Sequence, residues 1–436
     1  MGRIYDIAIV GAGAAGLFAA SYLTHSLSGA THKPSVIIIE KMPRPGRKLN
    51  ITGKGRCNLT NARMWDEFSV HIHPNQSFLK SSFYNLSSSQ TVDYFEKLGL
   101  PLTVERGQRV FPKSMRAMDV TDSLVNSIKR GGIVEFLTNS PVERINYSEQ
   151  ERRFSVQYLS SADSKPDTIC AKRILLTTGG LSYPSTGSTG DGYTFAKELG
   201  HTITPLYPSL TALIPANYSK IFNTSHKPLT IKNVALSLKV DGNIVQEEFG
   251  DVDFTSGGLE GSLGFRVSRK GVIALSNNSK VQVVIDFKPS ISLEKLSTRI
   301  STLASSSKEL KGGEIKRVLK QLLPNEIINP FLTFLSISKS QSINMLQLST
   351  TELAGYLKNY TLNIVGNVGY ERAVVTSGGV SLKEISSRTM ESKLVAGLYF
   401  AGELLDIDAD TGGYNLQCAF SSAALAIESI LKTLSV

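Results

Sequence analysis

A glycine-rich turn between an apolar strand and a helix constrains this chain more than any other segment. Residues 5–10 (YDIAIV) are typical of a short buried strand, and residues 17–23 have the apolar pattern of a helix. Between them lie Gly11, Gly13 and Gly16, in the G-x-G-x-x-G spacing of a dinucleotide-binding turn. The first glycine permits the tight turn, the second lets the backbone approach a pyrophosphate, and the third lets helix and strand pack closely. The segment therefore predicts an α/β domain that holds phosphates at a helix N-terminus.

A second predicted strand, residues 35–39, ends at Glu40. This carboxylate lies about two dozen residues beyond the last glycine of the turn, near the spacing of a ribose ligand. An acidic residue there suits the unphosphorylated ribose of FAD or NAD and disfavours NADP. We therefore predict that Glu40 binds a ribose.

Glycine-rich segments further along the chain favour FAD over NAD. Residues 173–177 predict another buried strand that ends in Thr-Gly-Gly, and residues 397–403 predict a strand that ends in Gly-Glu. Residues 411–415 (TGGYN) then lead into a helix of small residues, 419–431. This order resembles the large FAD-binding fold shared by glutathione reductase and fumarate reductase. The resemblance implies that Glu403 binds the ribityl chain and that the glycine-rich start of the last helix holds the flavin pyrimidine edge through backbone N–H groups.

Longer motifs narrow the resemblance to one family. Residues 46–61 (GRKLNITGKGRCNLTN) predict a glycine-rich basic loop, and residues 182–193, 375–385 and 410–417 are equally specific. Together they resemble the BaiN-type flavoproteins over nearly the whole chain. These proteins are aminoacetone-oxidase-like, FAD-dependent oxidoreductases, some of them implicated in bile-acid reduction.

One segment departs from the commoner family pattern. Many members read roughly F-T-H-x-G-[LI]-S-G-P, whereas residues 254–261 here read FTSGGLEG. Ser256 replaces the histidine and Glu260 replaces the serine. A catalytic role for such a histidine therefore does not transfer to this chain.

From these motifs we predict a set of cofactor-binding residues. They come from the glycine turn, the ribose position, the basic loop, the later glycine-rich segments and the start of the last helix: Gly11, Gly13, Ala14, Ala15, Gly16, Glu40, Lys41, Arg47, Lys48, Gly55, Arg56, Asn58, Thr60, Val142, Thr178, Gly179, Gly180, Thr189, Asp191, Gly402, Glu403, Gly412, Gly413, Tyr414, Asn415 and Leu416.

Catalytic residues are less well defined by the sequence. Tyr183 and Tyr414 are candidate proton donors, with packing or flavin contact as the alternative role. Lys48 and Arg47 could stabilise a reduced anionic flavin or pair with phosphates. Cys57 lies in the basic loop, where we expect a small buried residue beside the cofactor rather than a reactive thiol.

The flavin-facing motifs occur on both sides of a long insertion. We therefore predict a Rossmann-like FAD-binding domain of the glutathione reductase/fumarate reductase type, split between residues 1–199 and 365–436. Residues 200–288, with alternating strand-like runs, predict an inserted β-barrel-like unit. Residues 289–364 predict a helical cap, with Ser305–Gly313 as a loop between helices.

Composition excludes several classes of protein. The 436 residues, 41% hydrophobic and 19% charged, are typical of a globular chain of more than one domain. No apolar run approaches the roughly 20 residues that span a bilayer, and no secretory signal precedes the first strand, so we expect a cytoplasmic protein. Cys57, Cys170 and Cys418 are far apart and form no CxxC pair, which argues against a disulfide framework. His71 and His73 have no acidic or sulfur ligand near them in sequence, so we expect no metal.

Three classes of function remain open. The first is a small-molecule oxidoreductase that passes hydride between an organic substrate and FAD, with NAD(P)H or oxygen as the second partner. No second strand–GxGxxG–helix unit exists for a nicotinamide, so NAD(P)H would bind transiently. The second is a nucleic-acid-modifying flavoenzyme, because the net charge is +10; we disfavour it, since the basic residues are not interleaved with aromatics. The third is a flavin-binding protein without turnover.

Overall fold

A computed structural model describes residues 3–161, 165–222, 228–306 and 309–434. The chain divides into two compact units. Unit 1 comprises Met1–Pro208 and Val374–Val436, and unit 2 comprises Ser209–Ala373. The finer division at residues 199, 288 and 364 stays a prediction.

Unit 1 is built on a mixed sheet that, within the described residues, has seven strands. Their order is β7 (Val134–Leu137), β2 (Val36–Ile39), β1 (Ile4–Val10), β10 (Pro166–Leu176), β9 (Arg153–Leu159) and β8 (Val142–Ser148), with β21 (Leu398–Phe400) beside β10. Strands β7, β2, β1, β10 and β21 are parallel, whereas β9 and β8 are antiparallel. The parallel strands explain the continuous apolar runs of the sequence, since both faces of such a sheet are covered.

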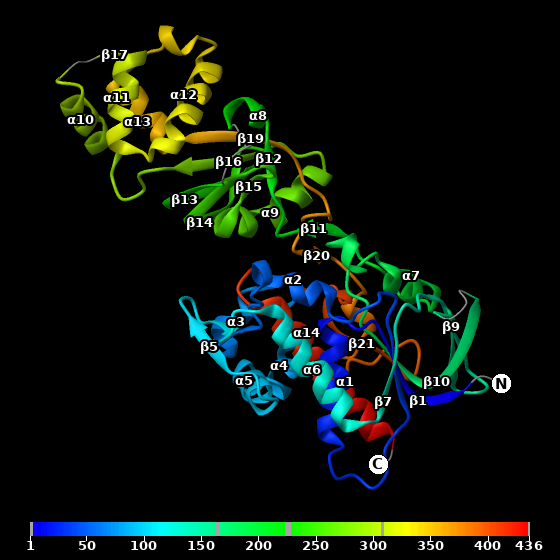
Figure 1. The fold of residues 1–436 in the computed structure, drawn as a ribbon. Helices are drawn as coiled ribbons and strands as arrows, with labels where there is room; N and C mark the ends of the chain where they lie inside the picture. The colour runs from blue at the N-terminus through cyan, green and yellow to red at the C-terminus, as the bar shows by residue number, and fades with distance from the viewer. Residues whose placement is uncertain (1–2, 162–164, 223–227, 307–308, 435–436) are drawn as a thin grey trace. The chain divides into compact units, whose positions relative to one another are not determined.

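Helices α1 (Ala14–Ser26), α6 (Ala117–Gly131) and α14 (Tyr414–Thr433) lie side by side (Figure 1). Phe18 of α1 stacks on Phe420 of α14 with ring centroids 4.8 Å apart. The predicted helices 17–23 and 419–431 are confirmed, and both begin earlier than predicted. The remaining helices of unit 1 are α2 (Arg47–Gly55), α3 (Trp65–Ser69), α4 (Lys80–Asn85), α5 (Ser88–Lys97) and α7 (Asp191–Glu198).

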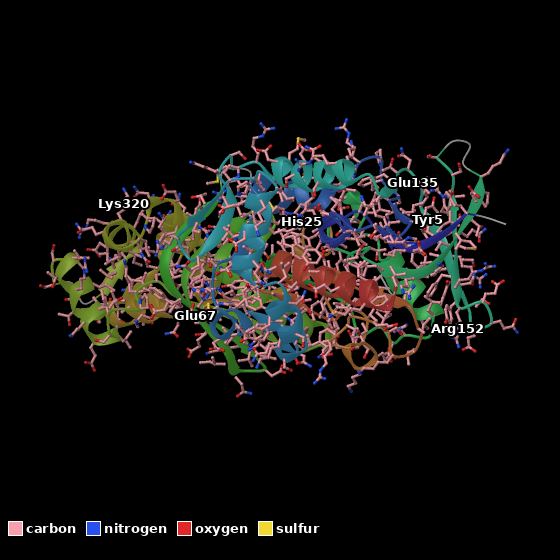
Figure 2. The ribbon with its side chains drawn as sticks, turned by 90° about the horizontal axis from the view of Figure 1, so that it is seen from below. Tyr5, His25, Glu67, Glu135, Arg152 and Lys320 are labelled. Atoms are coloured by element: carbon pink, nitrogen blue, oxygen red, sulfur yellow. The ribbon has the colours of Figure 1, made fainter. Side chains whose placement is uncertain are left out.

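Polar contacts also join the strands at the amino-terminal side of the sheet. The Tyr5 hydroxyl, on β1, donates to Glu135 Oε2 of β7 at 2.9 Å, across the shorter β2 (Figure 2). Arg3 pairs with the same carboxylate at 2.7 Å. Burial, followed by this carboxylate, raises the pKa of Tyr5 to about 12.

The prediction of a loop over residues 46–61 is wrong for its first part. Residues from Arg47 form helix α2, because Leu49 is buried and anchors the segment. The helical conformation breaks at Thr52 (ψ 147°), and Gly53 and Lys54 have φ near +57°. The loop therefore begins about six residues later than the basic composition indicated.

Unit 2 contains a closed barrel, as the sequence predicted. Its strands are β12 (Leu213–Pro215), β15 (Gly258–Glu260), β14 (Asn243–Thr255), β13 (Leu229–Val240), β16 (Val281–Asp286) and β19 (Tyr360–Asn367). Two features were not predicted. Helix α9 (Gly261–Ser276) lies in a region read as strands, and β19 reaches the barrel only after the helical segment.

The helical segment of unit 2 consists of α10 (Leu293–Leu303), α11 (Gly312–Leu322), α12 (Asn325–Lys339) and α13 (Thr350–Lys358) (Figure 1). The prediction of a loop over Ser305–Gly313 is wrong in part, because β17 (Glu309–Lys311) pairs with β18 (Gln347–Ser349). Residues 307–308 of that stretch lie outside the described residues. In the described part of the chain, no helix combines the length and apolarity needed to cross a membrane.

Candidate functional site

The carboxyl ends of the parallel strands bring the glycine-rich segments together. The backbone N–H of Gly11, after β1, donates to Ile39 O of β2 at 2.8 Å. Thr177 N, after β10, donates to Val10 O at 2.9 Å, and Ala401 N, after β21, donates to Leu176 O at 3.1 Å. Ligands of open α/β sheets bind at this edge.

The three glycines of the first turn meet different constraints. Gly11 has φ +100°, and a Cβ on Gly16 would lie 1.9 Å from Gly11 O, so only glycine fits at the contact between helix and strand. Gly13 has φ −79°, and the nearest atom to a Cβ there would be Thr177 O at 4.0 Å. Nothing in the described chain therefore requires glycine at position 13. The open space above it fits a ligand that approaches the backbone closely, as a pyrophosphate does.

Glu40 is fixed against the turn. Its Oε2 accepts from Ala12 N at 2.7 Å, and its Oε1 accepts from Met42 N at 2.8 Å. Burial raises the pKa of Glu40, although the two backbone N–H groups and the nearby charges of Lys41 and Arg47 oppose it. The carboxylate therefore lies beside the glycine turn, held by two backbone N–H groups.

A second cluster joins four segments around Glu403. Lys48 Nζ lies 2.7 Å from Glu403 Oε2, and Lys48 also donates to Ser182. Glu403 Oε1 accepts from the Ser182 hydroxyl at 2.8 Å and from Thr376 N at 2.9 Å. A Cβ on Gly180 would lie 2.4 Å from Thr376 Oγ1, so the close approach requires glycine.

The other predicted cations also contact predicted site residues or their neighbours. Lys41 pairs with Asp191 at 2.6 Å and donates to Thr189. Arg47 donates to Ser185 O at 3.3 Å. The structure thus brings these basic residues to the segment after β10.

Three of the nine buried side-chain polar atoms without a partner in the described residues belong to the predicted segments or their neighbours. In the described part of the chain, Asn58 Oδ1, Asn61 Oδ1 and Thr178 Oγ1 are buried and have no hydrogen-bond partner. Asn61 Nδ2 donates to Gly412 O at 3.0 Å, so its free oxygen adjoins the start of α14. Because unpaired buried polar atoms are costly, these three atoms fit a polar ligand.

Other predicted residues are tied to the protein itself. Arg56 lies over the Phe111 ring at 4.7 Å and 3.5 Å from Glu105. The Thr60 hydroxyl donates to Gln417 Oε1 of α14. Val142 is the first residue of β8 and follows Ser140, whose N–H donates to Glu40 O at 3.0 Å.

The remaining predicted residues lie on five segments. Ala14 and Ala15 begin α1; Gly55 ends α2 with φ +84°; Gly179, Gly402, Asn415 and Leu416 lie in the segments after β10 and β21 and in the first turn of α14. Asn415 accepts from Ala409 N at 2.8 Å. Tyr183 has φ +53°, and Tyr414 is 3% exposed.

Sequence reasoning missed Ser182, Thr376 and Asn61. All three lie within or beside motifs that carried the family resemblance, which is the signal that could have found them. Cys57, by contrast, is buried as expected, and burial raises the pKa of its thiol to about 12.

The sequence indicated no acidic residue near His71 and His73, but the structure places one beside both. His71 Nδ1 donates to Asp410 Oδ2 at 2.8 Å, and His73 Nε2 lies 3.5 Å from Asp410 Oδ1. Sequence could not show this, because Asp410 is 339 residues from His71. Among the residues that the structure describes, no group of three or more His, Cys, Asp or Glu side chains has an arrangement that could hold a metal ion.

The departing segment 254–261 forms the turn between β14 and β15 and the start of α9. Glu260 Oε1 accepts from the Thr255 hydroxyl at 2.8 Å and from Arg372 Nη2 at 3.0 Å. Ser256 is exposed at the tip of the turn. Glu260 is therefore occupied by an ion pair within unit 2.

Comparison with known proteins identifies similar chains. A family model described as HI0933-like protein Rossmann domain matches residues 5–429. A 3-dehydro-bile acid Δ(4,6)-reductase of Clostridium scindens is 30% identical over 421 residues, covering 96% of this chain and 97% of that protein. A ribosomal RNA dihydrouridine synthase of Haemophilus influenzae is 30% identical over 443 residues, covering 99% of each chain.

Solved structures show the same fold at low identity. A 3-ketosteroid Δ1-dehydrogenase from Sterolibacterium denitrificans matches with a TM-score of 0.50 and 13% identity, covering 99% of this chain and 100% of that chain. The fold of this chain is thus shared with a protein of much lower sequence identity.

Proposed function

Because the chain belongs to the HI0933-like protein Rossmann domain family of flavin-dependent oxidoreductases, we propose that it reduces a carbon–carbon double bond conjugated to a carbonyl group, with FAD as cofactor. One observation carries the proposal. The names of both relatives at 30% identity describe this class of reaction. A Δ4,6 bond of a 3-oxo bile acid and the uracil C5–C6 bond are each conjugated to a carbonyl.

The site residues fit FAD in three places. The free space at Gly13 and the N-terminus of α1 suit the pyrophosphate, and Glu40 suits the adenosine ribose. The unpartnered Asn58, Asn61 and Thr178 atoms supply further polar contacts. When bound, FAD supplies the hydride chemistry that side chains lack.

The chain's own residues would hold charge and protons. Lys48 is the best placed of the catalytic candidates, because its ammonium already joins Glu403 and Ser182 at the strand ends. We propose that it stabilises negative charge on the reduced cofactor. Tyr183 and Tyr414 remain candidates for the proton that the α carbon of the substrate takes up when hydride adds to the β carbon.

A small organic enone is the first substrate class, in line with the bile-acid relative. We propose NAD(P)H, bound transiently, as the electron donor. A cytoplasmic location of the protein stays a prediction. Oxygen as the second partner would instead make the protein an oxidase.

Uridine in RNA is the second candidate substrate. It is favoured by the name of the Haemophilus relative and by an exposed basic face on α11, formed by Lys316, Arg317 and Lys320. None of the ion pairs found within the described residues involves these three. Against it, no aromatic side chain lies among them to stack on bases.

The first experiment is an anaerobic titration of the purified protein with NADH or NADPH. Bleaching of the flavin absorbance, followed by its recovery on addition of a 3-oxo-Δ4,6 steroid, is the expected result. Recovery with a uridine-containing RNA and not with the steroid would select the second candidate. Reduction by neither nicotinamide would overturn NAD(P)H as the donor, and a chain that binds no FAD would overturn the whole proposal.

A further inference from the structure

The segment Asp410–Tyr414 joins β22 (Asp408–Ala409) to α14 and includes two glycines in the left-handed region. Gly412 has φ +132° and Gly413 has φ +96°. Glycines of this kind gain many backbone conformations when nothing restrains them. In the proposed function, the N–H groups that follow them contact the flavin, so the shape of this segment decides how well the site is formed.

His71 contacts both ends of the segment. At its start, Asp410 N donates to His71 O at 3.0 Å, and His71 Nδ1 donates to Asp410 Oδ2 at 2.8 Å. At its end, the His71 ring stacks on Tyr414, with centroids 4.3 Å apart and an interplanar angle of 26°. The pairing of β4 (Ile72–His73) with β22 sets this register, since Asp408 lies opposite His73.

The Tyr414 ring is confined on its other sides as well. Phe68 packs edge-on against it at 4.9 Å. A Cβ on Gly412 would lie 2.9 Å from Tyr414 Cε2, so the ring covers the first of the two glycines. A shift of the ring would therefore act directly on the backbone at Gly412.

The charged groups around His71 fix its tautomer. Arg63 Nη1 lies 3.1 Å from His71 Nε2, and a guanidinium can only donate, so Nε2 accepts and Nδ1 bears the hydrogen. Further titratable groups here include Asp408, opposite His73 in the strand pair, His73 itself, 3.5 Å from Asp410, and Glu67, 3.9 Å from Arg63. Burial opposes ionisation of Asp410, but the hydrogen bonds from His71 and His73 hold its pKa at about 2.

We propose that His71 is a positioning residue that clamps Asp410–Tyr414 in the conformation that binds the flavin, with Arg63 and Asp410 holding its ring in the Nδ1–H tautomer. The inference rests on the proposed FAD site and adds a residue outside every motif that pointed to that site. His71 itself need not touch the cofactor, because it acts through Tyr414 and the backbone of the two glycines.

The test compares His71→Ala with variants that each restore one contact. His71→Ala should weaken FAD binding about tenfold, the value of one aromatic contact. It should also speed amide hydrogen exchange over residues 411–414 in the cofactor-free chain. His71→Phe keeps a ring against Tyr414 and His71→Asn keeps a donor for Asp410, so each should recover part of the affinity. The matched control is His25→Ala, which removes an edge contact to Tyr94 at 5.8 Å and should change neither readout.

Each outcome decides something. Wild-type FAD affinity in His71→Ala, or exchange that speeds equally throughout unit 1, would overturn the clamp. If the wild-type chain binds no FAD, the proposed function fails, but exchange over 411–414 still decides the clamp: faster exchange in His71→Ala alone supports it, and unchanged exchange overturns it.

Discussion

Gly13 and Gly16 lie three positions apart, yet the packing of the chain requires glycine only at position 16. At Gly16 the obstacle is the protein, because a Cβ would collide with Gly11 O at 1.9 Å. At Gly13 the backbone has an ordinary negative φ, and the nearest atom to a Cβ, apart from its neighbours in the chain, would be Thr177 O at 4.0 Å. Packing therefore explains glycine at position 16, whereas at position 13 glycine is explained by the proposed pyrophosphate.

Two alanine substitutions separate these requirements. Gly13→Ala should leave the melting temperature within a few degrees of wild type but abolish FAD retention. Gly16→Ala should lower stability by about 1–3 kcal/mol or more, as overpacking does, and lose FAD as a consequence. Thermal unfolding of the cofactor-free variants measures their stability, and FAD titration measures their cofactor binding. Tight FAD binding by Gly13→Ala would contradict the assignment of the turn.

Asp410 should stabilise the fold in a defined range of pH. Its pKa is lowered from 3.8 to about 2, so the stabilisation is fully present above pH 4 and is lost as pH falls toward 2. The shift corresponds to roughly 2 kcal/mol. Urea unfolding between pH 5 and pH 2 should show a steeper loss of stability in wild type than in Asp410→Asn. If the stability of the two proteins falls equally with pH, the Asp410 carboxylate is not stabilised by His71 and His73.

At the scale of elements, side-chain contacts join segments that no strand pairing connects. Lys48 lies on α2, Ser182 in the loop after β10, Thr376 on β20 (Val375–Ser377) and Glu403 in the short turn after β21. Both ionised groups are only about 20% exposed. The Lys48–Glu403 pair is therefore a structural link between α2 and the strand ends, and a proposed part of the site.

Removing both partners of this link should cost less stability than the sum of the two single removals. Lys48→Met should destabilise unit 1 by about 1.5–3 kcal/mol, because it leaves the Glu403 carboxylate half-buried without its cation. The double variant Lys48→Met/Glu403→Leu should lose less than the sum of the single losses. Arg3→Ala is the control, since its pair with Glu135 is largely exposed and should contribute less than about 1 kcal/mol. Additive losses in urea unfolding would contradict the coupling.

At the scale of the whole molecule, unit 2 is one continuous stretch inserted into unit 1. Its first and last strands pair, with Leu213 opposite Asn367, so the barrel closes between the two ends of the insertion. Strands β11 (Tyr207–Ser209) and β20 pair where the chain leaves unit 1 and returns. Each unit therefore has its own core and closely spaced ends.

The two units should fold separately. Residues 209–373 expressed alone should give a cooperative thermal transition, since barrel closure needs no residue outside this range. A chain in which a short Gly/Ser linker replaces residues 211–372 should still bind FAD, since the predicted cofactor-binding residues all lie in unit 1. Circular dichroism measures the thermal transition of the fragment, and FAD titration measures binding by the shortened chain. An unfolded 209–373 fragment would show that unit 2 depends on the rest of the chain.

The sequence by itself determined the glycine turn, the position of Glu40, the flavin-binding class of the fold and the existence of a barrel. The glycine turn, Glu40 and the barrel follow from short-range patterns of strand periodicity and turn glycines. The flavin-binding class follows from the resemblance of the longer motifs, in their order along the chain, to a known fold. The tertiary structure alone decided that Lys48 pairs with Glu403, that Asp410 lies between His71 and His73, and that β19 closes the barrel after four helices. These contacts join residues that are up to 355 positions apart. No local pattern encodes such a partner, because the free energy that selects it comes from burial and pairing that exist only once the chain is folded.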